Sequence, residues 1–224
     1  MSDVRRIVLV GATGMVGQQV ITAAMQRPDV RLTAVSRREV LLPPGARMEV
    51  LVSETSHWAD AIAAGRPQVV VIALGTTIKA QGGDKAAFRA VDHDLVTAVA
   101  KAAKEAGARQ LIVVSSVGAA FSSRNFYLSV KGETEDALAK LRFDRLDILQ
   151  PGLLRGHREG PFRAAEAIGM IVAPVLDVLL MGSLAKYRSI RASALADVIL
   201  ALAGAKVKGR FVHENNEFRR ILRH

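Results

Sequence analysis

The sequence lacks cysteine altogether and has few aromatic residues, which make up 4% of its 224 positions. Without cysteine no disulfide can form, as is usual in a reducing compartment, and we expect the protein to be cytoplasmic. The first residues, Met1–Arg6, are polar and predict no signal peptide. The most apolar window, residues 168–181, contains Pro174 and Asp177. Because this window is shorter than the roughly 20 residues that span a bilayer, we expect no transmembrane segment.

Negative charge is in the minority, with 21 acidic residues against 31 Lys and Arg and a net charge of +10. The excess is spread along the chain, although Arg219, Arg220 and Arg223 cluster near its end. Aromatic residues do not alternate with the basic ones as they do in proteins that bind single strands, so we expect a solvated basic surface and no nucleic-acid partner. The five histidines lack metal-ligand spacing, and we expect no metal site.

Half of the residues are hydrophobic, and many gather in short runs separated by helix-forming segments. Strands are predicted at residues 7–10, 31–35, 46–52, 69–73, 110–115 and 146–150, with an edge strand at 209–213. Helices are predicted at residues 18–25, 58–64, 86–106, 127–141, 162–180 and 192–202. This alternation is typical of parallel βαβ units, so we expect an α/β protein with a Rossmann-like doubly wound parallel sheet. One NAD(P)-binding domain is expected over residues 1–224, in which residues 155–224 contribute a small C-terminal lobe on the substrate side.

Three glycines follow the first predicted strand, in Gly11-Ala-Thr-Gly-Met-Val-Gly17. A strand, a glycine turn of this spacing and a helix open a dinucleotide-binding unit. Gly11 lets the chain leave the strand, Gly14 lets a pyrophosphate approach the backbone, and Gly17 lets the helix pack on the sheet. Unpaired amide groups at the helix N-terminus attract the phosphate oxygens. We expect cofactor contacts from Gly11, Thr13, Gly14, Met15, Val16 and Gly17.

Ser36, Arg37 and Arg38 follow the second predicted strand. NAD-specific sheets carry an acidic residue at this position, which binds the ribose 2′-hydroxyl. The hydroxyl and two guanidiniums found here suit a 2′-phosphate, so we expect NADP(H), with NADPH preferred over NADH. The alternative is that both arginines are ordinary loop charges. We expect the adenine-ribose half of the cofactor near three residues after the fourth predicted strand, Leu74, Gly75 and Thr76.

Tyr127 and Lys131 are four residues apart and therefore share one face of a predicted helix. A nearby ammonium favours the phenolate form of a tyrosine and suits it to proton transfer. Ser116, after the preceding strand, can hold a carbonyl or alcohol oxygen beside the phenol, and Lys131 can also bind the nicotinamide ribose. A tyrosine and a lysine at this spacing are otherwise common on helix surfaces. The upstream pair Ser115-Ser116 therefore carries the prediction of a hydride-transfer site.

The motifs Gly11-Ala-Thr-Gly-Met-Val-Gly17, Val114-Ser-Ser116 and Tyr127-x-x-x-Lys131 resemble the short-chain dehydrogenase/reductase superfamily, of the atypical NAD(P)-binding kind. The segments at residues 74–77, 91–94, 127–133 and 143–152 are similar to those of the Tat-interacting-protein-type oxidoreductase-like group. The resemblance covers about residues 5–160. It implies a Rossmann-like fold, NADP(H) binding and a catalytic triad of Ser116, Tyr127 and Lys131. Ser115 is the less likely catalytic serine, and we also expect it at the cofactor. The resemblance further places Pro151, Gly152 and Leu153 near the nicotinamide.

Two features depart from the superfamily pattern. Asp92 stands where many members have the asparagine that completes a catalytic tetrad, and the interval from Ser116 to Tyr127 is slightly shorter than in many members. Relatives in the Tat-interacting-protein-type group are also associated with regulation and protein binding.

These features predict reversible hydride transfer between NADP(H) and a small-molecule carbonyl or alcohol substrate. The rival prediction is a catalytically weak NADP(H)-binding regulatory module that presents its C-terminal lobe to a protein partner. A third and weaker alternative is an epimerase or dehydratase that retains its cofactor. Apolar residues at 168–176 can line a substrate pocket, but core packing or a subunit interface explains them equally well. The helices at 86–106 and 127–141 can pair in a homodimer, as in relatives, but need not.

Overall fold

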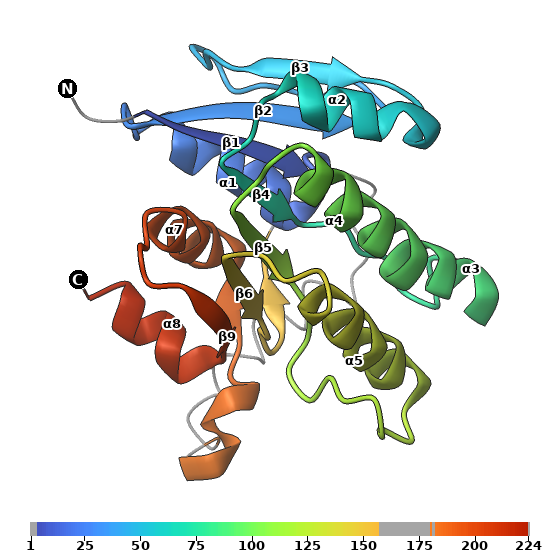
Figure 1. The fold of residues 1–224 in the computed structure, drawn as a ribbon. Coiled ribbons are helices and arrows are strands. Elements are labelled where there is room, and N and C mark those ends of the chain that lie inside the picture. The colour runs from blue at the N-terminus through green and yellow to red at the C-terminus, as the bar shows by residue number, and fades with distance from the viewer. Residues whose placement is uncertain (1–3, 157–179, 181, 224) are drawn as a thin grey trace.

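The computed structural model describes residues 4–156, 180 and 182–223. Seven strands form one parallel sheet in the order β3-β2-β1-β4-β5-β6-β9 (Figure 1). The strands are β1 (Arg5–Val10), β2 (Val30–Ser36), β3 (Glu49–Val52), β4 (Val69–Ile72), β5 (Gln110–Val114), β6 (Arg145–Leu149) and β9 (Gly209–His213). The chain starts in the middle of the sheet and winds outward in both directions, which confirms the predicted Rossmann-like α/β fold.

Side chains of the strands alternate between two hydrophobic cores, one on each face of the sheet. Ile7 and Leu9 enter one core, and their neighbours Val8 and Val10 enter the other. Helices α1 (Met15–Ala24), α7 (Ala192–Leu202) and α8 (Asn215–Ile221) contribute to the first core. Helices α2 (Trp58–Ala64), α4 (Val96–Glu105) and α5 (Phe126–Ala139) contribute to the second, and Figure 1 shows the two layers. Each fully buried Val, Leu or Ile side chain stabilises the fold by about 1.5–3 kcal/mol.

Most element boundaries lie within one or two residues of the prediction, but the starts of α1 and β3 differ by three. Helix α1 begins at Met15 rather than at residue 18, because Gly14 already serves as its N-cap. Strand β3 begins at Glu49 rather than at residue 46, because a turn extends into the predicted strand. In that turn the Ala46 amide donates a hydrogen bond of 3.1 Å to the Pro43 carbonyl. Helix α2, preceded by the 3₁₀ turn η1 (Thr55–His57), has the predicted bounds.

The predicted helix at residues 86–106 has three parts. It consists of α3 (Lys85–Arg89), the π-helical turn η2 (Ala90–Leu95) and α4. A π turn inserts one extra residue and so changes which side chains face the sheet. Asp92 lies in this turn and is only 1% exposed. Because its partners come from distant parts of the sequence, local helical periodicity does not predict the turn.

After β6 the chain forms a small parallel ribbon of two strands, β7 (Leu154–Arg155) and β8 (Ile190–Arg191). The 3₁₀ helix η3 (Gly182–Tyr187) precedes β8. Helix α7 and strand β9 occupy the residues predicted for them, and β9 pairs with β6 at the edge of the sheet. The helix predicted at 162–180 and the apolar residues at 168–176 lie outside the described residues. No helix in the described ranges is long and apolar enough to cross a membrane.

A buried polar network fastens β9 to the sheet. Asp147 on β6 accepts two hydrogen bonds of 2.7 Å from the Arg145 guanidinium. It also accepts one of 2.7 Å from Gln110 of β5, and it lies 2.8 Å from Nε2 of His213 on β9. Burial acts to raise the pKa of Asp147, but these hydrogen bonds outweigh it, and the pKa lies below its ordinary value. Three strands are therefore joined through one carboxylate.

Candidate cofactor-binding and catalytic site

The glycine turn after β1 packs directly on the loop after β4. Gly11 has a φ of +98°, and a Cβ atom there would lie 2.6 Å from the Ala73 carbonyl oxygen. A Cβ atom on Gly17 would overlap the Gly11 carbonyl oxygen, so this glycine lets α1 approach the turn. At Gly14 the nearest atom to an added Cβ is 3.3 Å away. Gly11 and Gly17 are thus required by packing, whereas Gly14 is less crowded.

The N-terminus of α1 presents backbone donors that no carbonyl of the helix accepts. Gly14 is the N-cap and supplies no side-chain hydrogen bond, and the first turn contains no acidic residue. The first intrahelical bond runs from the Gln18 amide to the Gly14 carbonyl, 2.9 Å, so the amides of residues 15–17 lack an intrahelical partner. Together with the helix dipole, these amides fit a phosphate group. Thr13, beside them, is exposed.

The end of β2 carries the residues predicted to select the cofactor. Ser36 is buried, and its Oγ accepts a hydrogen bond of 3.2 Å from the Arg38 amide. Arg37 and Arg38 are exposed, and neither forms an ion pair with a carboxylate in the described part of the chain. Their guanidiniums therefore remain available to an anion.

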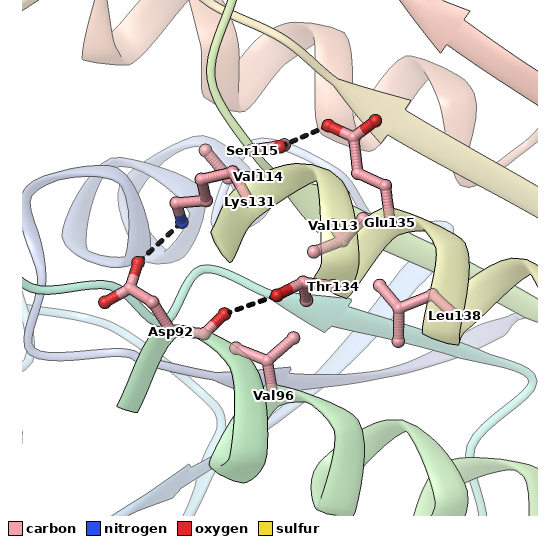
Figure 2. A pocket seen from close by; sticks show the side chains of 9 residues that line it. All are labelled: Asp92, Val96, Val113, Val114, Ser115, Lys131, Thr134, Glu135 and Leu138. Atoms are coloured by element: carbon pink, nitrogen blue, oxygen red, sulfur yellow. Dashed lines mark hydrogen bonds and ion pairs between the residues drawn. The ribbon is translucent and has the colours of Figure 1, made fainter. Parts of the chain in front are cut away.

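The loop after β4 lies over a buried ion pair. Lys131 Nζ of α5 is 2.7 Å from Asp92 Oδ1 of η2, and the two side chains are 7% and 0% exposed (Figure 2). The second carboxylate oxygen of Asp92 accepts a hydrogen bond of 2.8 Å from the Thr76 amide. A Cβ atom on Gly75 would lie 3.6 Å from Asp92 Oδ1 and 3.9 Å from Lys131 Nζ, whereas Leu74 packs against the core. Asp92 thus joins the predicted cofactor loop to the predicted catalytic helix.

Tyr127 lies one turn before Lys131 on α5, as the spacing predicts. Its ring packs against Phe88 of α3, with 5.4 Å between ring centroids, and Lys131 Nζ is 6.0 Å from the centre of the Tyr127 ring. Asn125 caps the helix through a hydrogen bond of 3.2 Å from the Leu128 amide to its side chain. The tyrosine and the ammonium are therefore close neighbours on an ordered helix.

The loop after Ser116 folds back onto α5. The Ala120 amide donates a hydrogen bond of 3.2 Å to the Leu128 carbonyl. Gly132 lies so close to the Ala120 backbone that a Cβ atom there would overlap it. The end of β5 is thereby held against the first turns of the helix that carries Tyr127. Ser116 itself is only partly buried.

Ser115 belongs to a second buried polar group, which the sequence motifs do not reveal. Its Oγ donates a short hydrogen bond to Glu135 of α5 (Figure 2), and Gln150 Nε2 lies 2.9 and 3.0 Å from the two carboxylate oxygens. Burial raises the pKa of Glu135, and these hydrogen bonds oppose that shift only in part. The sequence contains one signal for a role of Glu135, because this residue follows Lys131 by four positions and so shares its helix face.

The segment after β6 closes this end of the site. Pro151 is buried, and its carbonyl accepts a hydrogen bond of 3.0 Å from the Val117 amide. A Cβ atom on Gly152 would lie 2.5 Å from the Arg188 carbonyl oxygen, so only glycine fits this approach. Leu153 is 56% exposed. The predicted cofactor residues therefore follow the ends of β1, β2, β4, β5 and β6 along one edge of the parallel sheet, and α5 adds Tyr127 and Lys131.

A family model described as NAD(P)H-binding matches residues 11–206. The chain belongs to this NAD(P)H-binding family. Among its relatives, the mitochondrial protein fmp52 of Emericella nidulans is 38% identical over 177 residues, which cover 76% of this chain and 75% of that protein. The mitochondrial protein FMP52 of Eremothecium gossypii is 40% identical over 152 residues, or 67% of each chain. The family resemblance is confirmed at the level of NAD(P) binding, but these relatives are named Fmp52 rather than as the Tat-interacting-protein type.

The predicted cytoplasmic location is wrong. Relatives of this NAD(P)H-binding chain from several fungi are named as mitochondrial proteins. The prediction rested on the absence of cysteine, which reports on redox conditions and does not distinguish one reducing compartment from another.

Solved structures of similar fold include MoeE5 in complex with UDP-glucuronic acid and NAD, with a TM-score of 0.69 and 14% identity over 92% of this chain and 74% of that chain. The UDP-glucose 4-epimerase of Thermus thermophilus, in complex with NAD, also has a TM-score of 0.69, with 16% identity over 97% of this chain and 81% of that chain. At such low identity the likeness shows the fold alone.

Proposed function

We propose that this protein is an NADP(H)-dependent oxidoreductase of the short-chain dehydrogenase/reductase type, which transfers hydride to or from a small carbonyl or alcohol. The observation that supports this most is the buried Lys131, which is held 2.7 Å from Asp92 beneath the Gly75–Thr76 loop and one helical turn from Tyr127. Ligands of Rossmann-like sheets bind beyond the carboxyl ends of the strands, and this buried ammonium lies there beside Tyr127.

The residues that would hold the cofactor follow from the site. The free amides at the start of α1 bind the pyrophosphate, and Gly14 leaves room for it. Ser36, Arg37 and Arg38 receive the 2′-phosphate, since none of these three residues is a carboxylate that could bind a 2′-hydroxyl. Similar structures that hold NAD do not decide this preference for NADPH, because their identity to this chain is low.

The bound cofactor supplies the hydride that reaches the carbonyl carbon. Tyr127 gives its phenolic proton to the carbonyl oxygen, and the Ser116 hydroxyl holds the same oxygen by donating a hydrogen bond. One hydride and one proton convert the carbonyl to the alcohol, and the reverse reaction returns the proton to Tyr127. Lys131 places its positive charge 6.0 Å from the Tyr127 ring centre and donates to the ribose hydroxyls. Ser115 is less suited to the serine role because Glu135 already accepts its hydroxyl.

A calorimetric titration with NADPH and NADH tests the cofactor assignment. Wild-type protein is expected to bind NADPH more tightly than NADH, because two guanidiniums contact the additional phosphate. Replacing Arg37 and Arg38 together by Ala should remove that preference while leaving NADH affinity unchanged. The matched control is Arg219→Ala with Arg220→Ala, an adjacent pair of exposed arginines on α8. Equal weakening in the control would refute a specific role for Arg37 and Arg38, and no binding of either dinucleotide would refute the function.

Replacing Tyr127 by Phe separates the enzyme from the rival regulatory module. The change removes only the phenolic hydroxyl, so NADPH affinity should persist while NADPH oxidation with a panel of carbonyl compounds falls by about 10²–10⁴. Tyr187→Phe serves as the control, because Tyr187 is 42% exposed in η3 and is the second tyrosine of the chain. A wild type that binds NADPH yet turns over no carbonyl would favour the regulatory module.

A further inference from the structure

Two arginines outside the predicted site lie directly opposite each other. In the ribbon of β7 and β8, Leu154 pairs with Ile190, and Arg155 pairs with Arg191. Ile190 is buried in the first hydrophobic core, and Leu154 packs against that core. Because side chains alternate along a strand, Arg155 and Arg191 share the opposite face of the ribbon.

These two cations lack a counter-charge within the part of the chain that the structure describes. Neither guanidinium forms an ion pair with a carboxylate among residues 4–156, 180 and 182–223. Like charges opposite each other on paired strands repel and destabilise the pairing. In addition, the Nε atom of Arg155 is buried without a hydrogen-bond partner in those ranges, although the residue as a whole is partly exposed. An unpaired buried donor of a charged group is costly, so the arrangement suits a group that accepts from Nε and neutralises both charges.

The ribbon lies next to the proposed cofactor site. It begins directly after Pro151–Leu153, at the carboxyl end of β6. The residue after Arg155 reaches the glycine turn, since a Cβ atom on Gly156 would lie 2.9 Å from the sulfur of Met15. Met15 is the first residue of α1. The two arginines thus lie just after the predicted nicotinamide loop, near the carboxyl ends of the sheet strands, where ligands of such folds bind.

We infer that Arg155 and Arg191 form a subsite for a phosphate group of the substrate. This inference rests on the proposed function and specifies its substrate class, namely carbonyl or alcohol compounds that bear a phosphate or diphosphate. Two adjacent cations match a dianion better than a single carboxylate, and the Nε edge of a guanidinium binds two phosphate oxygens side by side.

Inorganic pyrophosphate is the probe, added to the protein in calorimetry with and without saturating NADPH. Wild type is expected to bind pyrophosphate in the presence of NADPH, and Arg155→Gln with Arg191→Gln should weaken that binding about tenfold or more. Arg155→Lys should weaken pyrophosphate binding less than Arg155→Gln does. Lysine keeps the positive charge but lacks the two parallel N–H donors of the guanidinium. Arg219→Gln with Arg220→Gln changes the net charge equally and should leave binding unchanged. Since Arg191 is exposed, Arg191→Gln alone gives a variant whose folding is not at issue.

Two outcomes would overturn the inference. Unchanged pyrophosphate affinity in the Arg155/Arg191 variants would refute the subsite alone, because it leaves the NADPH titration untouched. Displacement of pyrophosphate by NADPH, together with loss of NADPH affinity in these variants, would assign the arginines to the pyrophosphate of the cofactor. Failure of the wild type to bind NADPH would instead refute the proposed function.

Discussion

At the scale of single residues, Asp92 has the most consequences. Its two carboxylate oxygens have different partners, Lys131 Nζ at 2.7 Å and the Thr76 amide at 2.8 Å, so one side chain fixes both the ammonium and the cofactor loop. A neutral asparagine at this position would leave the positive charge of the ammonium without a counter-charge. The carboxylate therefore compensates part of the positive charge that Lys131 presents to Tyr127.

Replacing Asp92 by Asn should destabilise the protein. Lys131 is 7% exposed and would be left buried without its counter-charge, which typically costs about 3 kcal/mol or more. The free energy of unfolding in urea measures this loss. Asp94→Asn is the matched control, because Asp94 lies in the same π turn but is 62% exposed. Its effect should stay within about 0.5 kcal/mol, and an equal loss in both variants would contradict the argument.

Glu135 makes stability depend on pH in the opposite sense to most carboxylates. Because burial raises its pKa in the folded state, the folded protein retains a proton that the unfolded chain has released, and stability falls as the pH rises above the ordinary value of 4.5. Glu135→Gln removes this loss. The difference in unfolding free energy between variant and wild type should therefore grow in favour of the variant from pH 4 to pH 8.

Glu133 supplies the contrast on the same helix. Its hydrogen bond from Arg89 lowers its pKa, so its contribution to stability is present above the ordinary pKa and disappears on acidification. As the pH rises, the difference in unfolding free energy should move against Glu133→Gln. It should be small, because the ion pair is partly exposed to solvent. Parallel pH profiles for the two variants would show that burial does not govern Glu135.

At the scale of elements, the sequence predicts most of the sheet and its helices, but not the contacts that fix their details. Short apolar runs locate the strands, and Gly65 and Pro67 mark the end of α2. The π turn and the polar partners of Ser115 depend on side chains that come together only in the folded chain. Of the candidate site, motif spacing locates Tyr127 and Lys131 on one helix, whereas the joining role of Asp92 needs three dimensions.

A single buried carboxylate reinforces the pairing of the edge strand β9 with β6. Asp147→Asn should destabilise the protein by about 3–5 kcal/mol, because it leaves the 9% exposed Arg145 guanidinium without a counter-charge. Since hydrogen bonds hold the pKa of Asp147 below its ordinary value despite burial, this stability should be lost as the pH falls through that lowered pKa. Urea unfolding at pH 7 and at acid pH measures both effects.

Asp144→Asn is the control for this element. Asp144 also pairs with a cation, Lys208 at 3.0 Å, but it lies at the surface just before β6. Its replacement should change stability far less than that of Asp147. A comparable loss would mean that charge near β9, rather than the buried network, holds the strand in place.

At the scale of the whole molecule, residues far apart in sequence share one edge of the sheet. The order β3-β2-β1-β4-β5-β6-β9 brings the carboxyl ends of the inner strands together, and the amino ends form the opposite edge. The sequence predicts this arrangement because alternating strands and helices with right-handed crossovers permit few others. Cofactor preference, substrate and pairing in a homodimer stay predictions, since they depend on groups that bind from outside the chain.

Because the predicted cofactor residues lie in several loops along this edge, the binding of NADPH can be tested at all of these loops at once. If NADPH binds across the sheet as proposed, hydrogen exchange should slow together in five separated segments, residues 11–17, 36–38, 74–76, 115–117 and 152–153. Amides at the opposite edge, in residues 65–68 and 107–109, should exchange at the same rate with and without NADPH, because they lie a full strand length away. Slowing confined to residues 11–17 would mean that α1 binds only a phosphate and that no nicotinamide reaches Tyr127. The binding signal would then come from the glycine turn alone, and hydride transfer at this site would be refuted.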